Sequence, residues 1–87
     1  MTAVRWKRAA LDELADLWNR AESALRGEIT QAANEIDHRL KADPRQEGES
    51  RPRGRRILFV LPLGISFRVS ADGNTVWVLH VWQARRR

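Results

Sequence analysis

The sequence predicts an α+β fold in which an N-terminal antiparallel helical hairpin packs on a three- to four-stranded antiparallel sheet. Apolar residues recur every three to four positions in the first half of the chain and alternate every second position in the last third. An arginine-rich junction, residues 51–63, separates the two patterns. A chain of 87 residues forms one core. We therefore expect a single domain over residues 1–87, with the helical hairpin at about 7–43, a basic loop at 44–56 and a strand meander at 55–82.

The first half of the chain should form two helices, because two apolar stripes follow each other almost without a break. The first stripe is Leu11, Leu14, Ala15, Trp18 and Ala21, and the second is Leu25, Ile29, Ala32, Ala33, Ile36 and Leu40. We expect Ser23 to cap the second helix and Asp43-Pro44 to end it, since the residue before a proline avoids helical conformation. Helices joined by so short a connection lie antiparallel.

Strands are expected at residues 55–61, 65–71 and 75–82, and a brief edge strand at 3–6. Asp72-Gly73 predicts a tight hairpin between the last two strands, because both central positions of such a turn need positive φ. The turn therefore sets the register of these two strands and decides which side chains share a face.

Centred on this turn, the hairpin has one face suited to the core and one open face. The core face collects Ile65, Phe67, Val69, Val76, Val78, His80 and Trp82, and the open face collects Ser66, Arg68, Ser70, Trp77, Leu79 and Val81. We expect the helices to cover the core face. Exposed apolar residues indicate a contact surface, so Trp77, Leu79 and Val81 are the candidate partner-binding residues, for a different protein or for a homodimer.

The composition favours an anionic partner. Sixteen Lys and Arg against eleven Asp and Glu give a net charge of +5, and only Lys7 and Lys41 are lysines. Arginine makes forked hydrogen bonds to phosphate, although a genome rich in G and C would produce the same bias without a ligand. The chain has no cysteine, which excludes disulfides and thiolate chemistry. The apolar run at 57–65 is too short to span a membrane and no secretory signal follows Met1, so we expect a cytoplasmic protein with no membrane partner.

The candidate nucleic-acid-binding residues are arginines in or beyond the basic loop: Arg51, Arg53, Arg55, Arg56, Arg68 and Arg85. Each phosphate that they neutralise would add salt-dependent affinity. The alternative is a solvated loop in which the first four arginines balance Glu47 and Glu49. Arg68 also faces Trp77 in the expected register, which predicts a cation–π pair. Stacking of Trp77 on a base is the competing interpretation.

Acid–base and metal chemistry have few candidates in this chain. Imidazole exchanges protons near neutral pH, so His80 is a candidate general acid or base, but the expected register places it on the core face as a structural histidine. No second ligand lies at metal spacing from His80 or His38, and no glycine-rich phosphate loop is present. We therefore expect neither a metal nor a cofactor.

Short segments along nearly the whole chain follow each other in a specific order. They are Ala10-Leu11-Asp12-Glu13-Leu14 with Trp18, Ile29-Thr30-Gln31-Ala32, Ile36-Asp37 with Leu40, Asp43-Pro44, Gly48-Glu49-Ser50-Arg51, Pro62-Leu63-Gly64-Ile65 and residues 76–82. This order resembles the RelE/ParE toxin superfamily of bacterial type II toxin–antitoxin systems. The resemblance implies a small microbial-ribonuclease-like fold and a cognate antitoxin that wraps around the toxin.

The resemblance also implies one of two targets, because members of that superfamily cut messenger RNA on the ribosome or poison DNA gyrase. The cutters depend on basic residues on the sheet face, often with an aromatic or acid–base group. Here Leu63-Gly64 stands where an arginine commonly enters the middle strand, Gln83-Ala84 stands where a basic residue ends the last strand, and tyrosine is absent. Endoribonuclease activity is therefore left open, with Arg55, Arg68 and His80 as catalytic candidates.

Our leading hypothesis is a toxin that inhibits translation by binding RNA or the ribosome, with cleavage of messenger RNA as a further step. An antitoxin would mask its arginine-rich sheet face. The second hypothesis is an inhibitor of DNA gyrase that works by protein contact without chemistry of its own. The third is a catalytically silent interaction module of the same fold.

Overall fold

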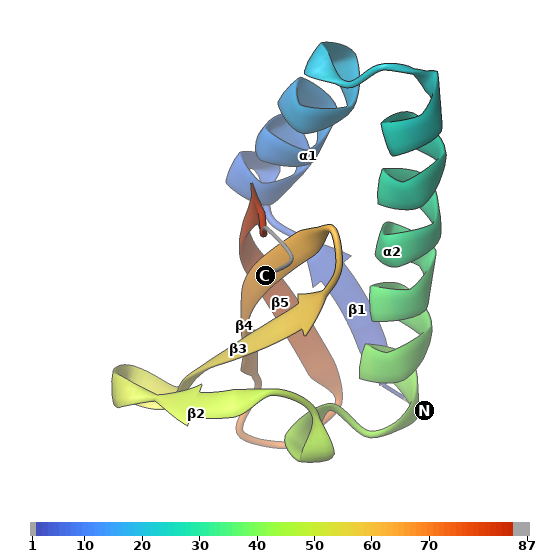
Figure 1. Cartoon of the computed structure of the whole chain (residues 1–87). Coiled ribbons are helices and arrows are strands. Elements are labelled where there is room, and N and C mark those ends of the chain that lie inside the picture. Colours follow the sequence, from blue (N-terminus) through green and yellow to red (C-terminus); the bar gives the residue numbers. More distant parts are fainter. Residues whose placement is uncertain (1, 85–87) are drawn as a thin grey trace.

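The computed structural model describes residues 2–84, and Figure 1 shows how the chain is arranged. The elements in chain order are β1 (Ala3–Trp6), α1 (Arg8–Arg20), α2 (Ser23–Ala42), the 3₁₀ turn η1 (Pro44–Gln46), β2 (Glu49–Arg51), the 3₁₀ turn η2 (Pro52–Gly54), β3 (Arg55–Val60), β4 (Leu63–Val69) and β5 (Thr75–Gln83). The expected helical hairpin packed on a mostly antiparallel sheet is confirmed.

The sheet has five strands in the order β1-β5-β4-β3-β2. The expected edge strand at residues 3–6 is present, but it runs parallel to β5, so the sheet is mixed. The other neighbours are antiparallel. The fifth strand, β2, lies within the segment expected to be a loop, because its three residues are all polar and show no strand pattern. The sheet therefore has five strands, one more than the three to four that were expected.

Two residues, Ala21 and Glu22, connect the helices. Arg26 closes this corner: its Nε donates to the Trp18 carbonyl at 2.9 Å and its Nη2 donates to the Asn19 carbonyl at 3.3 Å. The Trp18 carbonyl also accepts the Ala21 N–H at 3.2 Å, so Arg26 adds a second bond there and one to the Asn19 carbonyl at the end of α1. The expectation that Ser23 caps α2 is wrong, because Ser23 is the first helical residue and the cap position, Glu22, makes no side-chain cap bond.

The core lies between the helices and one face of the sheet. Its buried apolar residues are Ala10, Ala21, Ile29, Ala32, Ile36, Leu40, Leu58, Leu63, Ile65, Phe67, Val76, Val78 and Val81. Paired residues on neighbouring strands point to the same face, and Leu58 pairs with Ile65, which pairs with Val81. We call this the inner face and the opposite side of the sheet the outer face.

A β-bulge in β5 overturns part of the expected register. Val69 pairs with Val76 and Phe67 pairs with Val78 as expected, but Ser66 pairs with His80, so Leu79 is an extra residue. Beyond the bulge each side chain changes face: His80 is exposed on the outer face, whereas Val81 is only 3% exposed. The expected core position of His80 and the expected open position of Val81 are therefore wrong. The apolar spacing explains the bulge, since Val78 and Val81 both reach the core although they are three residues apart.

Candidate nucleic-acid interface

One row of side chains crosses all five strands of the outer face. Arg5 pairs with Trp77, Trp77 with Arg68, Arg68 with Arg55, and Arg55 with Arg51. Directly paired residues share a face, and all five are exposed. We call Arg5, Arg51, Arg55 and Arg68 the arginine row. Trp77 lies between Arg5 and Arg68 in this row.

The arginine row brings like charges into direct opposition. Cross-strand pairs of like charge destabilise a sheet, yet Arg55 faces both Arg51 and Arg68. Arg51 has partial compensation, because its Nη2 lies 3.0 Å from Glu49 Oε2. Arg68 Nη2 donates to the backbone carbonyl of Arg53 at 3.1 Å, which holds the guanidinium but leaves its charge without a carboxylate partner among residues 2–84. An anionic partner would supply the missing compensation.

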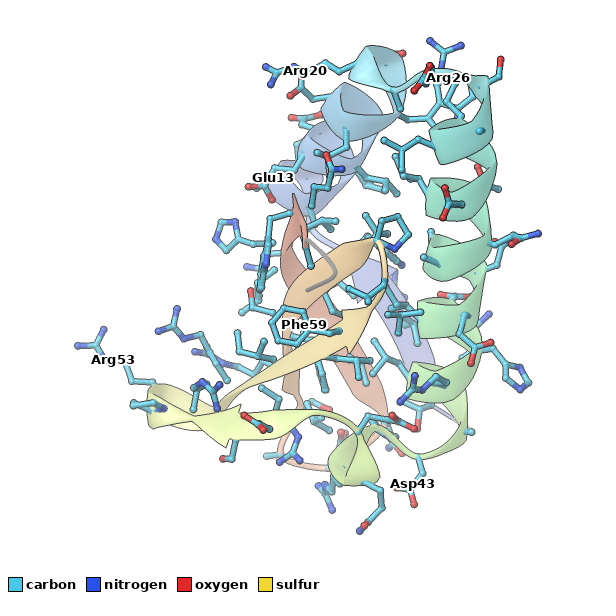
Figure 2. The ribbon with its side chains drawn as sticks, viewed as in Figure 1. Glu13, Arg20, Arg26, Asp43, Arg53 and Phe59 are labelled. Carbon is cyan, nitrogen blue, oxygen red and sulfur yellow. The ribbon has the colours of Figure 1, made fainter. Side chains whose placement is uncertain are left out.

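The other predicted arginines lie apart from the row. Arg53 occupies the tip of the turn between β2 and β3 with φ of 67°, and Figure 2 shows it pointing away from the body of the protein. Arg56 points the other way from Arg55 along β3. Its Nε donates to the Glu47 carbonyl at 2.8 Å and its Nη2 donates to the Gly48 carbonyl at 3.2 Å, so it holds the loop before β2. Arg85 lies outside the described residues.

Trp77 is 38% exposed and has a cation over its ring, but the cation is not Arg68. Lys7 Nζ lies 5.8 Å from the ring centroid. Neither Arg5 nor Lys7 was among the candidates from the sequence. Apolar and basic residues alternate over Val4, Arg5, Trp6 and Lys7, which indicates a strand. The parallel pairing that brings this strand to Trp77 joins residues about 70 positions apart in the sequence, so no local pattern predicts it.

His80 lies on the outer face one row from Arg68, because Ser66 pairs with His80 and stands two positions before Arg68. Its Nδ1 lies 3.3 Å from both carboxylate oxygens of Glu13. Glu13 Oε1 also accepts a hydrogen bond from the Val81 backbone N–H at 3.1 Å. Figure 2 labels Glu13 on α1. Glu13 was not among the candidates from the sequence, since no local signal links it to a strand 67 residues away.

This pairing gives the outer face a histidine held by a carboxylate. A carboxylate at Nδ1 orients the ring and leaves Nε2 available to accept or donate a proton. Within residues 2–84, no group of three His, Cys, Asp or Glu side chains could hold a metal ion. The outer face thus presents a row of guanidinium groups and one imidazole that a carboxylate orients.

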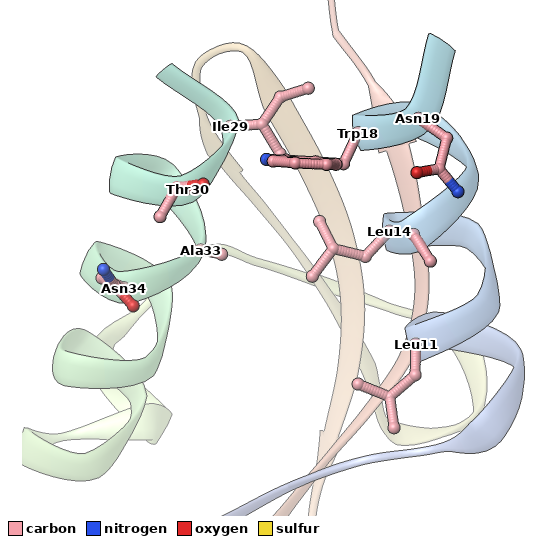
Figure 3. A pocket seen from close by; sticks show the side chains of 9 residues that line it. Leu11, Leu14, Trp18, Asn19, Ile29, Thr30, Ala33 and Asn34 are labelled. Carbon is pink, nitrogen blue, oxygen red and sulfur yellow. The ribbon is translucent and has the colours of Figure 1, made fainter. Parts of the chain in front are cut away.

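A second exposed surface is the groove between α1 and α2, with a volume of about 340 Å³. Figure 3 shows Leu11, Leu14 and Trp18 projecting from α1 toward α2, where Ile29 and Ala33 face them. Leu11 is 48% exposed and Trp18 is 40% exposed, so the helices cover the apolar stripe of α1 only in part. Arg26 stacks on Trp18, with its guanidinium carbon 4.4 Å from the centroid of the ring. None of the described helices is long and apolar enough to cross a membrane.

Three solved structures share this fold. The toxin–antitoxin complex RelBE2 from Mycobacterium tuberculosis matches with a TM-score of 0.74 and 20% identity, covering 97% of this chain and 98% of that chain. The chromosomal ParDE toxin–antitoxin system from P. aeruginosa matches with a TM-score of 0.67 and 21% identity over 98% of both chains. The intact E. coli RelBE toxin–antitoxin complex matches with a TM-score of 0.61 and 20% identity, covering 99% of this chain and 100% of that chain. No curated protein matches the sequence.

The fold is thus that of the small toxins of toxin–antitoxin complexes, as the resemblance in the sequence predicted. A family model described as the ParE toxin of the type II toxin–antitoxin system parDE matches residues 4–87. The chain belongs to this ParE toxin family.

Proposed function

We propose that this toxin binds RNA through the arginine row and thereby inhibits translation. The observation that carries the proposal is the alignment of Arg5, Arg68, Arg55 and Arg51 across the sheet. Folding gains nothing from opposed guanidinium groups, whereas a phosphate backbone lying along the row would neutralise them and release counterions. A row across the strands also suits an extended ligand better than a compact anion.

Cleavage of the bound RNA is the chemistry that His80 makes available. In such a step the ribose 2′ oxygen attacks the phosphorus, a 2′,3′-cyclic phosphate forms, and the bond to the 5′ oxygen of the next nucleotide breaks, with that oxygen taking a proton from water. His80 Nε2 would take the 2′ proton, Glu13 would position the ring, and the Arg68 guanidinium would stabilise the charge on the phosphoryl oxygens. The sequence alone argued against His80, because the expected register directed it into the core.

The same proposal gives this toxin a cognate antitoxin, because two of the similar structures are toxin–antitoxin complexes. Acidic side chains of the antitoxin would mask the arginine row, and an apolar segment would cover Leu11 and Trp18 in the groove between the helices. The partner surface expected at Trp77, Leu79 and Val81 loses Val81, which the bulge buries. A homodimer that used all three residues is therefore not compatible with the buried position of Val81.

Inhibition of DNA gyrase is the second candidate, and the match to the ParE family model favours it. In that case the arginine row would contact gyrase or its DNA, and His80 would have no chemical role. The two candidates differ in the first process that stops in the cell.

The test is controlled expression with measurement of growth and of labelled incorporation into protein and DNA. We expect protein synthesis to fall first, and Arg55→Glu and Arg68→Glu to restore growth. Arg20→Glu is the matched control, because Arg20 is an exposed arginine at the end of α1, far from the outer face, and should leave toxicity unchanged. An early fall in DNA synthesis would indicate gyrase. Full toxicity of both row variants would overturn the role of the arginine row.

A further inference from the structure

We propose that Phe59 is a stacking platform for a base of single-stranded RNA whose backbone follows the arginine row. This inference rests on the proposed function and names the kind of RNA that the site takes. Phe59 stands on the outer face of β3, where it pairs with Gly64 and is 54% exposed. Figure 2 labels Phe59.

The distance between Phe59 and the row suits one RNA strand. Phe59 follows Arg55 by four residues on the same strand and the same face, and each residue of a strand advances about 3.3 Å, so their Cα atoms are separated by about 13 Å. A nucleic-acid strand advances about 3.4 Å per nucleotide when fully stacked. A segment of about four nucleotides or fewer therefore connects the two places.

The Phe59 ring is held in place before any ligand arrives. Its edge-on partner is Trp82, with ring centroids 6.1 Å apart and an interplanar angle of 83°. Trp82 in turn lies on Gly64: a Cβ there would stand 2.6 Å from two atoms of the indole. A ring fixed in this way loses little freedom when a base stacks on it, which favours binding.

The charge of the outer face selects RNA over an apolar partner as the occupant. An apolar protein segment that covered both Phe59 and the arginine row would bury guanidinium groups without partners, which is costly. Single-stranded nucleic acid supplies both a polyanionic backbone and unpaired bases, and aromatic rings beside basic grooves are the usual means of binding it. A duplex keeps its bases paired and cannot place one on Phe59.

The experiment compares two labelled oligomers of about eight nucleotides, oligouridine and an abasic strand with the same number of phosphates. We expect the full-length protein to bind oligouridine about tenfold more tightly than the abasic strand, as one stacked base would give. Phe59→Ala should lose this preference and keep its affinity for the abasic strand, whereas Phe59→Tyr should retain the preference.

Leu61→Ala is the matched control, because Leu61 is also an exposed apolar residue but lies beside Glu28 of α2 instead of on the outer face. It should keep the preference for oligouridine. If Phe59→Ala prefers oligouridine as strongly as the unaltered protein does, the inference is overturned. If the unaltered protein binds both strands equally and in a salt-dependent way, base stacking on Phe59 is overturned, whereas phosphate binding by the arginine row is supported. Binding of neither strand would overturn the proposed function itself.

Discussion

Glu13 reaches from α1 to His80 on β5, with its carboxylate oxygens 3.3 Å from Nδ1. The contact exists because β1 pairs with β5 only as far as Val78, so beyond that residue no strand of residues 2–84 lies along this edge of β5. Glu13 takes the place of a strand there by accepting the Val81 N–H at 3.1 Å. One carboxylate thus closes the sheet edge and positions the histidine.

Replacing Glu13 by alanine should lower the free energy of unfolding by about 1 to 3 kcal/mol, because the Val81 N–H loses its acceptor beside a buried side chain. Glu13→Gln keeps a carbonyl oxygen and should lose less. Urea denaturation of the two variants measures the difference. Equal stability of the alanine variant and the unaltered protein would show that Glu13 does not support this edge.

His80→Ala should slow RNA cleavage by about 10²- to 10⁴-fold if the ring takes the 2′ proton. The affinity for uncleaved RNA should stay the same, because His80 lies one row away from the arginine row. Cleavage rates at saturating protein and binding to a 2′-deoxy substrate separate the two effects. A variant that cleaves at the unaltered rate would remove His80 from the chemistry.

Arg68→Gln should reduce the slope of log affinity against log salt concentration by about 0.7, the value for one phosphate contact to a single strand. The affinity should fall for all RNA sequences alike, since a phosphate contact reads no base. Arg20→Gln, at an exposed site on α1, should leave the slope unchanged. The prediction fails if the two variants give the same slope.

Gly64→Ala should destabilise the protein by about 1 to 3 kcal/mol, because the added Cβ would overlap the Trp82 indole and force it to move. Tryptophan emission should shift at the same time. Gly27→Ala is a suitable contrast: Gly27 lies in α2 with nothing within 4 Å of the added Cβ, so the change should stabilise the helix by up to about 1 kcal/mol. Destabilisation by both variants, or by neither, would contradict the packing described here.

The turn between β4 and β5 should carry a pH-dependent part of the stability. A hydrogen bond from the Ser70 hydroxyl, followed by one from the Asn74 N–H, lowers the pKa of Asp72 below its ordinary value. A lowered pKa means that the folded protein favours the carboxylate, so this stabilisation is present above about pH 3.9, the ordinary pKa, and is lost as the pH falls through the folded pKa. Asp72→Ala should therefore be less stable than the unaltered protein at pH 7, and the difference should shrink in acid. A difference that does not change with pH would argue against this role.

The elements that local patterns encode were predictable from the sequence. Both helices follow from apolar spacing, the position of the β4–β5 turn from Asp72-Gly73, and the edge strand from residues 3–6. The expectation that both residues of this turn have positive φ is wrong for Asp72, because only Gly73 of the pair does. Each of these features depends on neighbours along the chain, such as the positive φ of 76° at Gly73. The resemblance to the RelE/ParE superfamily was likewise visible in the order of these segments and is confirmed by the family match.

The arrangement of the outer face depends on contacts between distant segments, so local patterns in the sequence could not predict it. A single extra residue at Leu79 moves His80 out of the core and Val81 into it, because side chains alternate along a strand and one added residue reverses every position beyond it. The arginine row likewise requires the registers of four strand pairs together, one of them parallel. Composition and the order of local segments were enough to predict an arginine-rich chain with the fold of this class of toxin. The pairing of distant strands sets which arginines lie in one row and places His80 on the same face.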